Sequence, residues 1–222
     1  MTTPAPDVYV VGAGGHAREV HSYITDIQKS GEPIVLKGFL DDHLEPGSHG
    51  RLDVLGNISS LRGNLPGHAR FITALGTNAV RRDVVAHIRK RTGDTLPAWT
   101  LIHPTAITGE DVEIGAGTCL APSAIVTANT RIGRHVIINI RASVSHDCSV
   151  GDFVNINPGA VICGWVTIGE GAYIGAGAVI KDRISIGAWS TIGAGAVVIR
   201  DVPENAMVAG VPARPIKTAQ KH

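Results

Sequence analysis

Aliphatic residues recur every six positions through the C-terminal half of the chain. From Ile114 to Val198 every sixth residue is Ile, Leu or Val, and the frame never slips. A second column of small or β-branched residues lies four positions after the first, from Thr118 to Ala196. A six-residue unit holds one short strand and one turn, too little to fold alone, so stacked coils must bury a shared column. The pattern predicts a parallel β-helix of hexapeptide repeats.

Glycine often follows the aliphatic residue of a repeat directly. We expect a turn with positive φ at these glycines, because glycine adopts that conformation without steric cost. Strand residues alternate between inside and outside, so chemically active side chains are expected at the turns. The glycines concerned are Gly115, Gly133, Gly151, Gly169, Gly175, Gly187 and Gly193.

The N-terminal part alternates short apolar runs with segments of helical periodicity. Apolar runs at residues 8–11, 34–40 and 70–75 predict strands, and residues 18–28 and 79–90 predict helices. This alternation is typical of an α/β domain with a parallel sheet. Residues 45–67 carry Gly and Pro and are expected to be rich in loops. We therefore expect an α/β domain at residues 1–97 and the β-helix domain at residues 98–222.

Candidate ligand-binding residues follow the predicted strands of the α/β domain. Ligands of parallel sheets bind beyond the carboxyl ends of the strands. The spacing Gly12-x-Gly14-x-x-Ala17 matches a relaxed dinucleotide fingerprint. A full Rossmann domain needs about 150 residues, so this half-Rossmann-like unit should hold a single nucleotide. The backbone N–H groups of this loop would suit a phosphate, although the glycines could equally serve only a tight turn.

Composition narrows the function classes. The chain has 222 residues, and 20 Lys and Arg balance 19 Asp and Glu, which disfavours nucleic acid as a partner. No apolar run approaches a membrane span and residues 1–7 lack the basic start of a secretory signal, so we expect a cytoplasmic protein. The three cysteines are expected to be reduced thiols. Only His135 and His146 fall inside the repeat, which argues against a metal site such as that of hexapeptide-repeat carbonic anhydrases.

Six motifs occur in an order that resembles one family. Together they resemble the sialic-acid O-acetyltransferase-like family of hexapeptide-repeat sugar acetyltransferases, and most closely its bacterial nucleotide-4-aminosugar N-acetyltransferases. The resemblance implies a left-handed β-helix, a homotrimer with active sites between subunits, acetyl-CoA as co-substrate and a nucleotide-activated amino sugar as partner. The motifs are Gly12-Ala-Gly-Gly-His16, Phe39-Leu-Asp-Asp42, Gly76-Thr-Asn78 with Arg81, His103-Pro-Thr-Ala106, Ser145-His-Asp-Cys148 and Gly210-Val-Pro-Ala213.

By resemblance, His146 is the catalytic base, Asp147 is its acidic neighbour and Asn139 is a polar residue near the base. The repeat agrees, because His146 follows the inward Val144 by two residues and so falls at a turn. An imidazole has an unperturbed pKa of about 6.5, so it can accept a proton at neutral pH, and a neighbouring carboxylate can fix its tautomer. The alternative is that His146 only closes a coil. Cys148 falls in the small inward column and is expected to pack there rather than act as a nucleophile.

The resemblance also assigns binding residues. For acetyl-CoA it points to the turns at Gly164, Ala176 and Ala194, with Arg214 available to a phosphate. Asn155 stands where many members carry a second His near the acetyl group, a substitution that abolishes proton transfer. For the nucleotide sugar the expected residues are Gly12, Gly14, Gly15, His16, Asp41, Asp42, Thr77 and Asn78, with Asp41 and Asp42 accepting hydrogen bonds from the base.

The expected activity is acetyl-CoA-dependent N-acetylation of the 4-amino group of a nucleotide-linked 4-amino-4,6-dideoxy sugar, by direct attack. One alternative is an O-acetyltransferase of a sialic acid or another surface-polysaccharide sugar. Another is a trimeric nucleotide-sugar-binding protein without catalysis. The residues do not distinguish UDP, GDP and dTDP, because each base offers an imino N–H. Trp165, Trp189 and Tyr173 fall at or near turns and are expected to pack between subunits.

Overall fold

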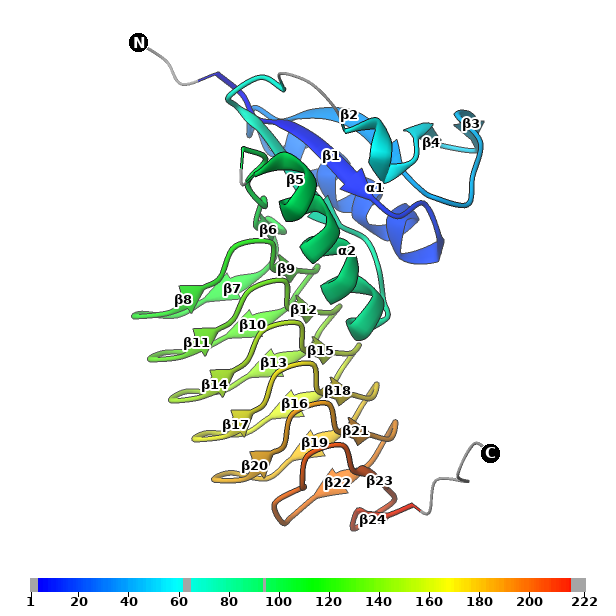
Figure 1. Ribbon diagram of the computed structural model, residues 1–222. Helices are drawn as coiled ribbons and strands as arrows, with labels where there is room; N and C mark the ends of the chain where they lie inside the picture. Colours follow the sequence, from blue (N-terminus) through cyan, green and yellow to red (C-terminus); the bar gives the residue numbers. More distant parts are fainter. Residues whose placement is uncertain (1–3, 62–64, 94, 217–222) are drawn as a thin grey trace, which may run out of the picture. The chain divides into compact units, whose positions relative to one another are not determined.

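The chain divides into two compact units, with the boundary in the sequence between Pro104 and Thr105. The computed structural model describes residues 4–61, 65–93 and 95–216 (Figure 1). In the described part of the chain, no helix has the length and apolar character that crossing a membrane requires.

The first unit is built on a five-stranded sheet with the order β3-β4-β2-β1-β5. The inner strands are β1 (Asp7–Val11), β2 (Val35–Leu40) and β5 (Ala69–Thr73), and both neighbours of β1 run parallel to it. Val8, Val10 and Val11 are buried, as expected for a central strand covered on both faces. The parallel sheet predicted from the apolar runs is confirmed.

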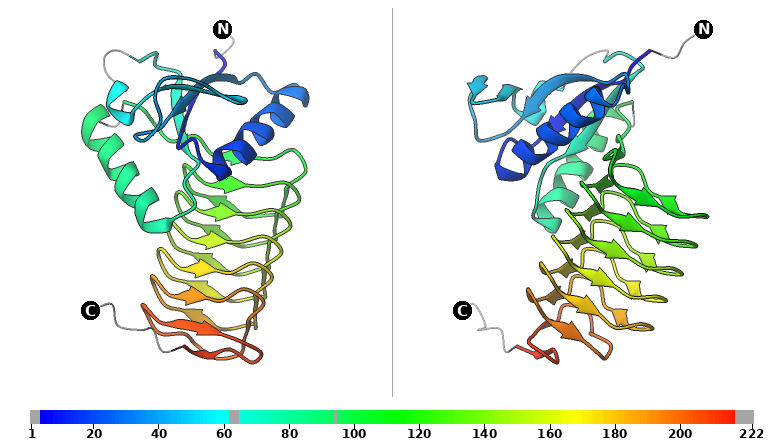
Figure 2. Two further views of the ribbon diagram at one scale, coloured as in Figure 1. Left: turned by 90° about the vertical axis from the view of Figure 1, so that its right-hand side faces the viewer. Right: turned by 180° about the vertical axis from the view of Figure 1, so that it is seen from behind.

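Two helices cover opposite faces of this sheet (Figures 1 and 2). Helix α1 (Gly15–Lys29) follows β1, and α2 (Asn78–Thr92) follows β5. Helix α1 buries Ala17, Val20, Tyr23, Ile24 and Ile27, which lie on one face at helical spacing. Strand β6 (Leu101–Ile102) lies close to the end of the unit.

The segment expected to be loop-rich contains more regular structure than its Gly and Pro content indicates. Strand β3 (Gly47–His49) pairs antiparallel with β4 (Leu52–Gly56), and a 3-10 turn, η1, spans Ile58–Ser60. Leu52 and Val54 are buried while Asp53 and Leu55 are not, which is the alternation of a half-buried strand. The loop prediction was therefore wrong for these residues, because β4 pairs with both β2 and β3 and so becomes part of the sheet.

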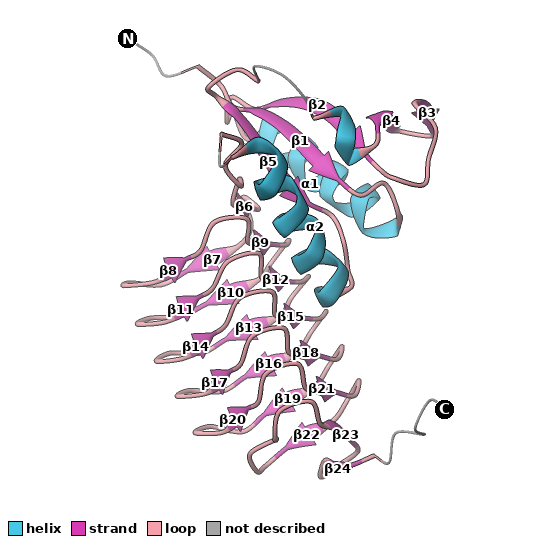
Figure 3. Cartoon of the chain, viewed as in Figure 1, coloured by secondary structure: helices cyan, strands magenta, loops and turns pink. Residues whose placement is uncertain are grey.

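The second unit is a parallel β-helix, as the hexapeptide pattern predicts (Figure 3). Each strand pairs with the strand three elements further on, so one coil takes 18 residues and has three sides. The sides are the sheets β7-β10-β13-β16-β19-β22 and β8-β11-β14-β17-β20, and a third that includes β9-β12-β15-β18-β21-β23-β24. The strands are β7 Ile107–Thr108, β8 Glu113–Ile114, β9 Cys119–Leu120, β10 Ile125–Val126, β11 Arg131–Ile132, β12 Ile137–Ile138, β13 Ser143–Val144, β14 Ser149–Val150, β15 Asn155–Ile156, β16 Val161–Ile162, β17 Thr167–Ile168, β18 Tyr173–Ile174, β19 Val179–Ile180, β20 Ser185–Ile186, β21 Thr191–Ile192, β22 Val197–Val198, β23 Met207–Ala209 and β24 Arg214–Pro215.

Both inward columns line the core of the β-helix. The aliphatic column is buried from Leu120 onward, and Ile114 at its start is partly buried. The second column is buried from Thr118 to Ala196. Stacking therefore removes from water an apolar surface that no single repeat could bury alone.

The glycines that follow the aliphatic residues do not have positive φ, so that expectation was wrong. The left-handed residue of each turn comes two positions later, for example at Gly117, Asp147 and Trp165. The glycines instead lie against the backbone of the next coil: a Cβ on Gly169 would come within 2.5 Å of the amide nitrogen of Ala188. Coil stacking, rather than turn conformation, excludes a side chain at these positions.

Candidate active site

His146 lies on a turn between strands β13 and β14, at one corner of the β-helix. We call this edge the His146 corner; it comprises the turns at residues 128–129, 146–147, 164–165 and 182–183, which are 18 residues apart. The side chain of His146 is 47% exposed. The expected turn position is confirmed, and the imidazole is open to a ligand.

Asp147 fixes one nitrogen of the His146 ring. Its Oδ2 lies 2.8 Å from Nδ1 of His146, while Asn129 Nδ2 lies 3.5 Å from Oδ1. Asp147 has a φ of 58°, in the left-handed region that Asp tolerates better than most residues. A carboxylate on Nδ1 favours the tautomer that carries its proton there, which leaves Nε2 as the acceptor.

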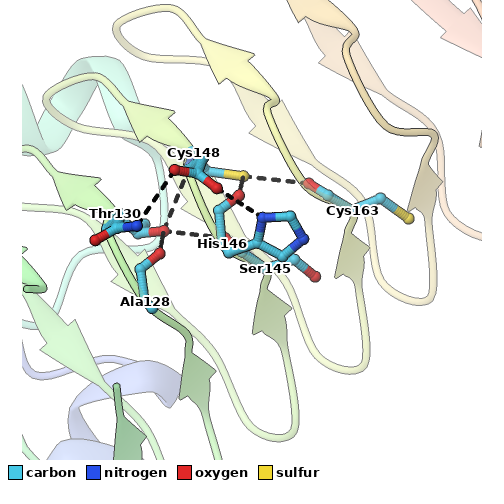
Figure 4. Close-up of polar contacts among 8 residues, drawn as sticks. Ala128, Thr130, Ser145, His146, Cys148 and Cys163 are labelled. Carbon is cyan, nitrogen blue, oxygen red and sulfur yellow. Dashed lines mark hydrogen bonds and ion pairs between the residues drawn. The ribbon is translucent and has the colours of Figure 1, made fainter. Parts of the chain in front are cut away.

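Buried polar contacts hold this turn in place (Figure 4). Oγ1 of Thr130 lies 3.0 Å from the carbonyl oxygen of Ser145 and accepts from the backbone N–H of Cys148 at 3.4 Å. The thiol of Cys148 lies 3.2 Å from the carbonyl oxygen of Cys163 on the following coil. Burial raises the pKa of this thiol, so it stays protonated and donates to that carbonyl. Its contacts and raised pKa fit the expected packing role rather than that of a nucleophile.

Gly164 packs directly beneath the His146 ring. A Cβ at Gly164 would lie 2.7 Å from Cε1 and 2.9 Å from Nε2 of the imidazole. Gly164 is itself buried, because the ring covers it. The geometry therefore gives this glycine a role that the sequence did not indicate, namely space for the imidazole.

Two further residues of the His146 corner surround the ring. The indole of Trp165 stands perpendicular to the imidazole, with 4.5 Å between the ring centroids. The guanidinium carbon of Arg183 lies 4.4 Å from the centroid of the Trp165 ring. Sequence reasoning missed both contacts, and the 18-residue spacing of residues 147, 165 and 183 was the signal that could have found them.

Other expected residues lie at a different corner of the β-helix. Asn139, Ala176 and Ala194 occupy turns that join the β9-β12-β15 side to the β10-β13-β16 side, and we call this edge the Asn139 corner. Asn155 lies on β15, which leads into that corner, and its side chain is buried. Within a single chain, Asp147 and Gly164 therefore lie next to His146. The residues at or near the Asn139 corner are separated from His146 by one side of the β-helix.

Arg214 belongs to the end of the β-helix. It lies on β24, is exposed, and lines a cavity of about 230 Å³ together with Arg200, Asp201 and Pro203. The structure thus places Arg214 beside Arg200 at one hollow, far along the chain from the His146 turn.

In the first unit, the loop between β1 and α1 has the expected conformation. Gly12 has a φ of 102°, and a Cβ there would lie 2.8 Å from a methyl group of Leu75. Gly14 and Gly15 are exposed and precede or begin α1, so their N–H groups are available to an anion. Nδ1 of His16 lies 2.8 Å from Oε2 of Glu19, and this hydrogen bond lowers the pKa of the Glu19 carboxyl.

Two buried polar atoms in this region have no hydrogen-bond partner among the described residues: Nε2 of His16 and Oγ1 of Thr73. Thr73 ends β5 and is paired in register with Val11, the last residue of β1. Unsatisfied buried polar atoms are rare in proteins. Both lie near the carboxyl edge of β1 and β5, where a bound water or a ligand would complete their hydrogen bonding, and Thr73 was not singled out by the sequence.

The carboxylates of the two aspartates after β2 accept hydrogen bonds from backbone N–H groups. Asp41 accepts from the N–H of Ala13 at 2.8 Å and from that of His43 at 2.9 Å. Asp42 accepts from the N–H of Ile58 at 2.9 Å. Both line a cavity of about 340 Å³ next to Asn57 and Ser60. Asp41 therefore connects the glycine loop to the end of β2 through a hydrogen bond, and its Oδ2 already has a partner within the protein.

Thr77 and Asn78 begin helix α2, with Thr77 exposed and Asn78 buried. Arg81 is fully buried one turn further on, and its Nη1 donates to the carbonyl oxygen of Leu75 at 2.7 Å. Arg81 thus fixes the loop that leads into Thr77, which explains its place in the motif.

Comparison with known proteins agrees with this architecture. Residues 7–88 match the family model of the PglD N-terminal domain, and residues 166–200 match that of the bacterial transferase hexapeptide (six repeats). The acetyltransferase domain of PglB from Neisseria gonorrhoeae is 33% identical, with 95% of this chain and 99% of that chain covered and a TM-score of 0.86. The chain belongs to the hexapeptide-repeat acetyltransferases that carry a PglD-type N-terminal domain. The family expected from the six motifs is confirmed.

Two other members of this family have similar solved structures. WeeI from Acinetobacter baumannii is 31% identical, with 96% of this chain and 100% of that chain covered and a TM-score of 0.85. Perosamine N-acetyltransferase from Caulobacter crescentus is 29% identical, with 96% and 97% covered and a TM-score of 0.83. That structure, of a variant with one histidine replaced by asparagine, contains CoA and GDP-perosamine, and one of the PglB domain contains acetyl-CoA. No curated protein matched the chain.

Proposed function

We propose that this acetyltransferase transfers the acetyl group of acetyl-CoA to the 4-amino group of a nucleotide-linked 4-amino-4,6-dideoxy sugar. The observation that carries the proposal is the exposed His146 imidazole, whose Nδ1 is held by Asp147 at 2.8 Å. The family relationship to perosamine N-acetyltransferase supports the substrate class.

The chemistry needs a single base. The sugar amine attacks the thioester carbonyl carbon, a C–N bond forms, and a backbone N–H stabilises the oxyanion. His146 accepts the proton of the amine at Nε2 while Asp147 stabilises the imidazolium. The C–S bond then breaks, and the CoA sulfur leaves with a proton returned by His146. No acyl-enzyme is required, in keeping with the buried thiol of Cys148.

The nucleotide part of the substrate is proposed to bind at the loop between β1 and α1. The exposed N–H groups of Gly14 and Gly15 suit a diphosphate at a helix start. Nε2 of His16 lacks a partner among the described residues and can serve the phosphates or the sugar. Asp42, Thr77 and Asn78 are proposed to complete this binding region, with Asp41 holding the loop.

The active enzyme is proposed to be a homotrimer. In one chain the Asn139 corner and the His146 corner are different edges of the β-helix. A three-fold assembly can bring Asn139 and Asn155 of one subunit to His146 of the next, with acetyl-CoA lying along the small turns at Ala176 and Ala194. The same arrangement would leave Arg214 available to a CoA phosphate.

The decisive experiment is a thiol-release assay with acetyl-CoA and UDP-, GDP- and dTDP-linked 4-amino-4,6-dideoxy sugars. We expect release with one of the three, and loss of that activity in the His146→Ala variant. Release with none of them would contradict the proposal and would favour O-acetylation of a sugar that lacks the nucleotide. Mass spectrometry of the product then separates an N-acetyl from an O-acetyl group by its stability to mild base.

Mixing inactive variants tests the trimer. If His146→Ala and Asn139→Ala are each inactive, subunits mixed by unfolding and refolding together should regain activity, because some sites combine an intact His146 with an intact Asn139. Absence of recovery in trimers shown by mass spectrometry to be mixed would contradict a site shared between subunits.

A further inference from the structure

Trp165 and Arg183 form a stack that continues from the catalytic pair along the His146 corner. The stack consists of residues 147, 165 and 183, which are the left-handed residues of three successive coils, with φ of 58°, 56° and 62°. Side chains at this position leave each coil in the same direction, so they meet their counterparts one coil away. Neither Trp165 nor Arg183 belongs to the residues assigned above to acetyl-CoA or the nucleotide sugar.

The His146 ring is contacted on three sides within one chain. Asp147 holds Nδ1, Gly164 lies beneath Cε1, and the Trp165 indole stands perpendicular to the ring with centroids 4.5 Å apart. An exposed histidine would otherwise exchange between rotamers. Perpendicular aromatic pairs at this separation attract each other. The hydrogen bond to Asp147 does not by itself stop rotation about the side-chain bonds of His146. The indole of Trp165 therefore limits this rotation.

Arg183 in turn restrains Trp165, which is 47% exposed. Its guanidinium lies over the indole at 4.4 Å, within the range of a cation–π contact. A flexible indole could not orient the imidazole. The contact between Arg183 and Trp165 therefore supports the contact between Trp165 and His146.

We propose that Trp165 is a positioning residue for the catalytic base and that Arg183 supports it through the indole. The proposal rests on the proposed role of His146 as general base. It predicts that Trp165→Ala lowers kcat by about 10- to 100-fold, the cost of a base displaced by about 1 Å. The KM for both substrates should change by less than about threefold, because neither binding surface is altered. Trp165→Phe should restore most of the lost kcat, since phenylalanine keeps a ring beside the imidazole.

Arg183→Gln should have a smaller effect in the same direction. Exposed cation–π contacts contribute modestly, so we expect kcat to fall roughly two- to fivefold. Trp189 provides the matched control, because it is also a left-handed tryptophan with a φ of 56° at a corner of the β-helix away from His146. Trp189→Ala should keep kcat within about twofold of the wild type.

An NMR measurement at a single pH tests the contact without any enzyme assay. The ring current of an indole shifts the resonances of protons held beside it, so the imidazole ring protons of His146, assigned by their loss in His146→Gln, should move in Trp165→Ala and much less in Trp189→Ala. An inactive enzyme that still shows this shift would refute the proposed function but not the contact. Imidazole resonances that do not move in Trp165→Ala, or a Trp165→Ala variant with kcat within twofold of the wild type, would overturn the positioning role.

Discussion

Replacing Gly164 by alanine tests the idea that the base depends on the space beneath it. A Cβ at this position would lie 2.7 Å from Cε1 of His146, whereas carbon atoms in contact are ordinarily about 3.5 Å apart or more. The ring must therefore move by roughly 0.8 Å or more, and it is half exposed, so it can move toward solvent. A displacement of about 1 Å at a catalytic group can cost about 100-fold in rate. We expect kcat to fall by about that factor.

Stability should change far less than activity. The backbone of this corner accepts a side chain, because Ala128 occupies the equivalent turn position two coils earlier. The glycine has no positive φ, so alanine adds no left-handed strain. Overpacking costs typically 1–3 kcal/mol, and we expect the lower end, about 1 kcal/mol, since the ring can yield.

The measurements are kcat and KM by thiol release and the free energy of unfolding in urea. The same substitution in the His146→Ala background provides the control, because without the imidazole the new methyl group meets no ring and the stability cost should disappear. An equal stability cost in both backgrounds would refute the reasoning. So would an unchanged kcat with a raised KM for acetyl-CoA, which would assign Gly164 to the pantetheine instead.

Three further changes have expected outcomes. Asp147→Asn removes the charge beside Nδ1, so kcat should fall about 10- to 100-fold with little change in KM, measured by thiol release. Asp41→Ala leaves the N–H of Ala13 without its acceptor, so we expect a loss of about 1–3 kcal/mol in urea unfolding and a raised KM for the nucleotide sugar. Burial raises the pKa of the Asp152 carboxyl, but the hydrogen bonds and positive charge of Arg134 outweigh this effect and hold the pKa below its usual value. The resulting stability is present above about pH 4 and is lost as the pH falls through the folded-state pKa, so in urea unfolding the wild type should lose more stability than Asp152→Asn between pH 7 and pH 3.

The repeat could be predicted almost residue by residue because burial imposes it. Each coil must place an aliphatic side chain at the same inward position, so Ile114, Val144 and Val198 share one frame. The corner glycines show the limit of that reasoning. Their spacing was visible, but two physical causes, positive φ and close backbone approach, both select glycine, and only the structure separates them.

The catalytic pair could be placed at a turn from the sequence because His146 and Asp147 are neighbours in the chain. The residues that adjust its geometry could not be assigned in this way, since Gly164 and Trp165 lie about 18 residues away and reach it only because one coil has that length. Asn139 is closer in sequence and still lies at another corner. In a β-helix, separation by a full coil means proximity and separation by six means the next face, so the residues that modify a site should be sought one coil away from it. Applied to His146, this rule selects Ala128 and Gly164, and applied to Asp147 it selects Asn129 and Trp165. All four have contacts to the pair, since the carbonyl oxygen of Ala128 accepts from the backbone N–H of Asp147 at 3.1 Å.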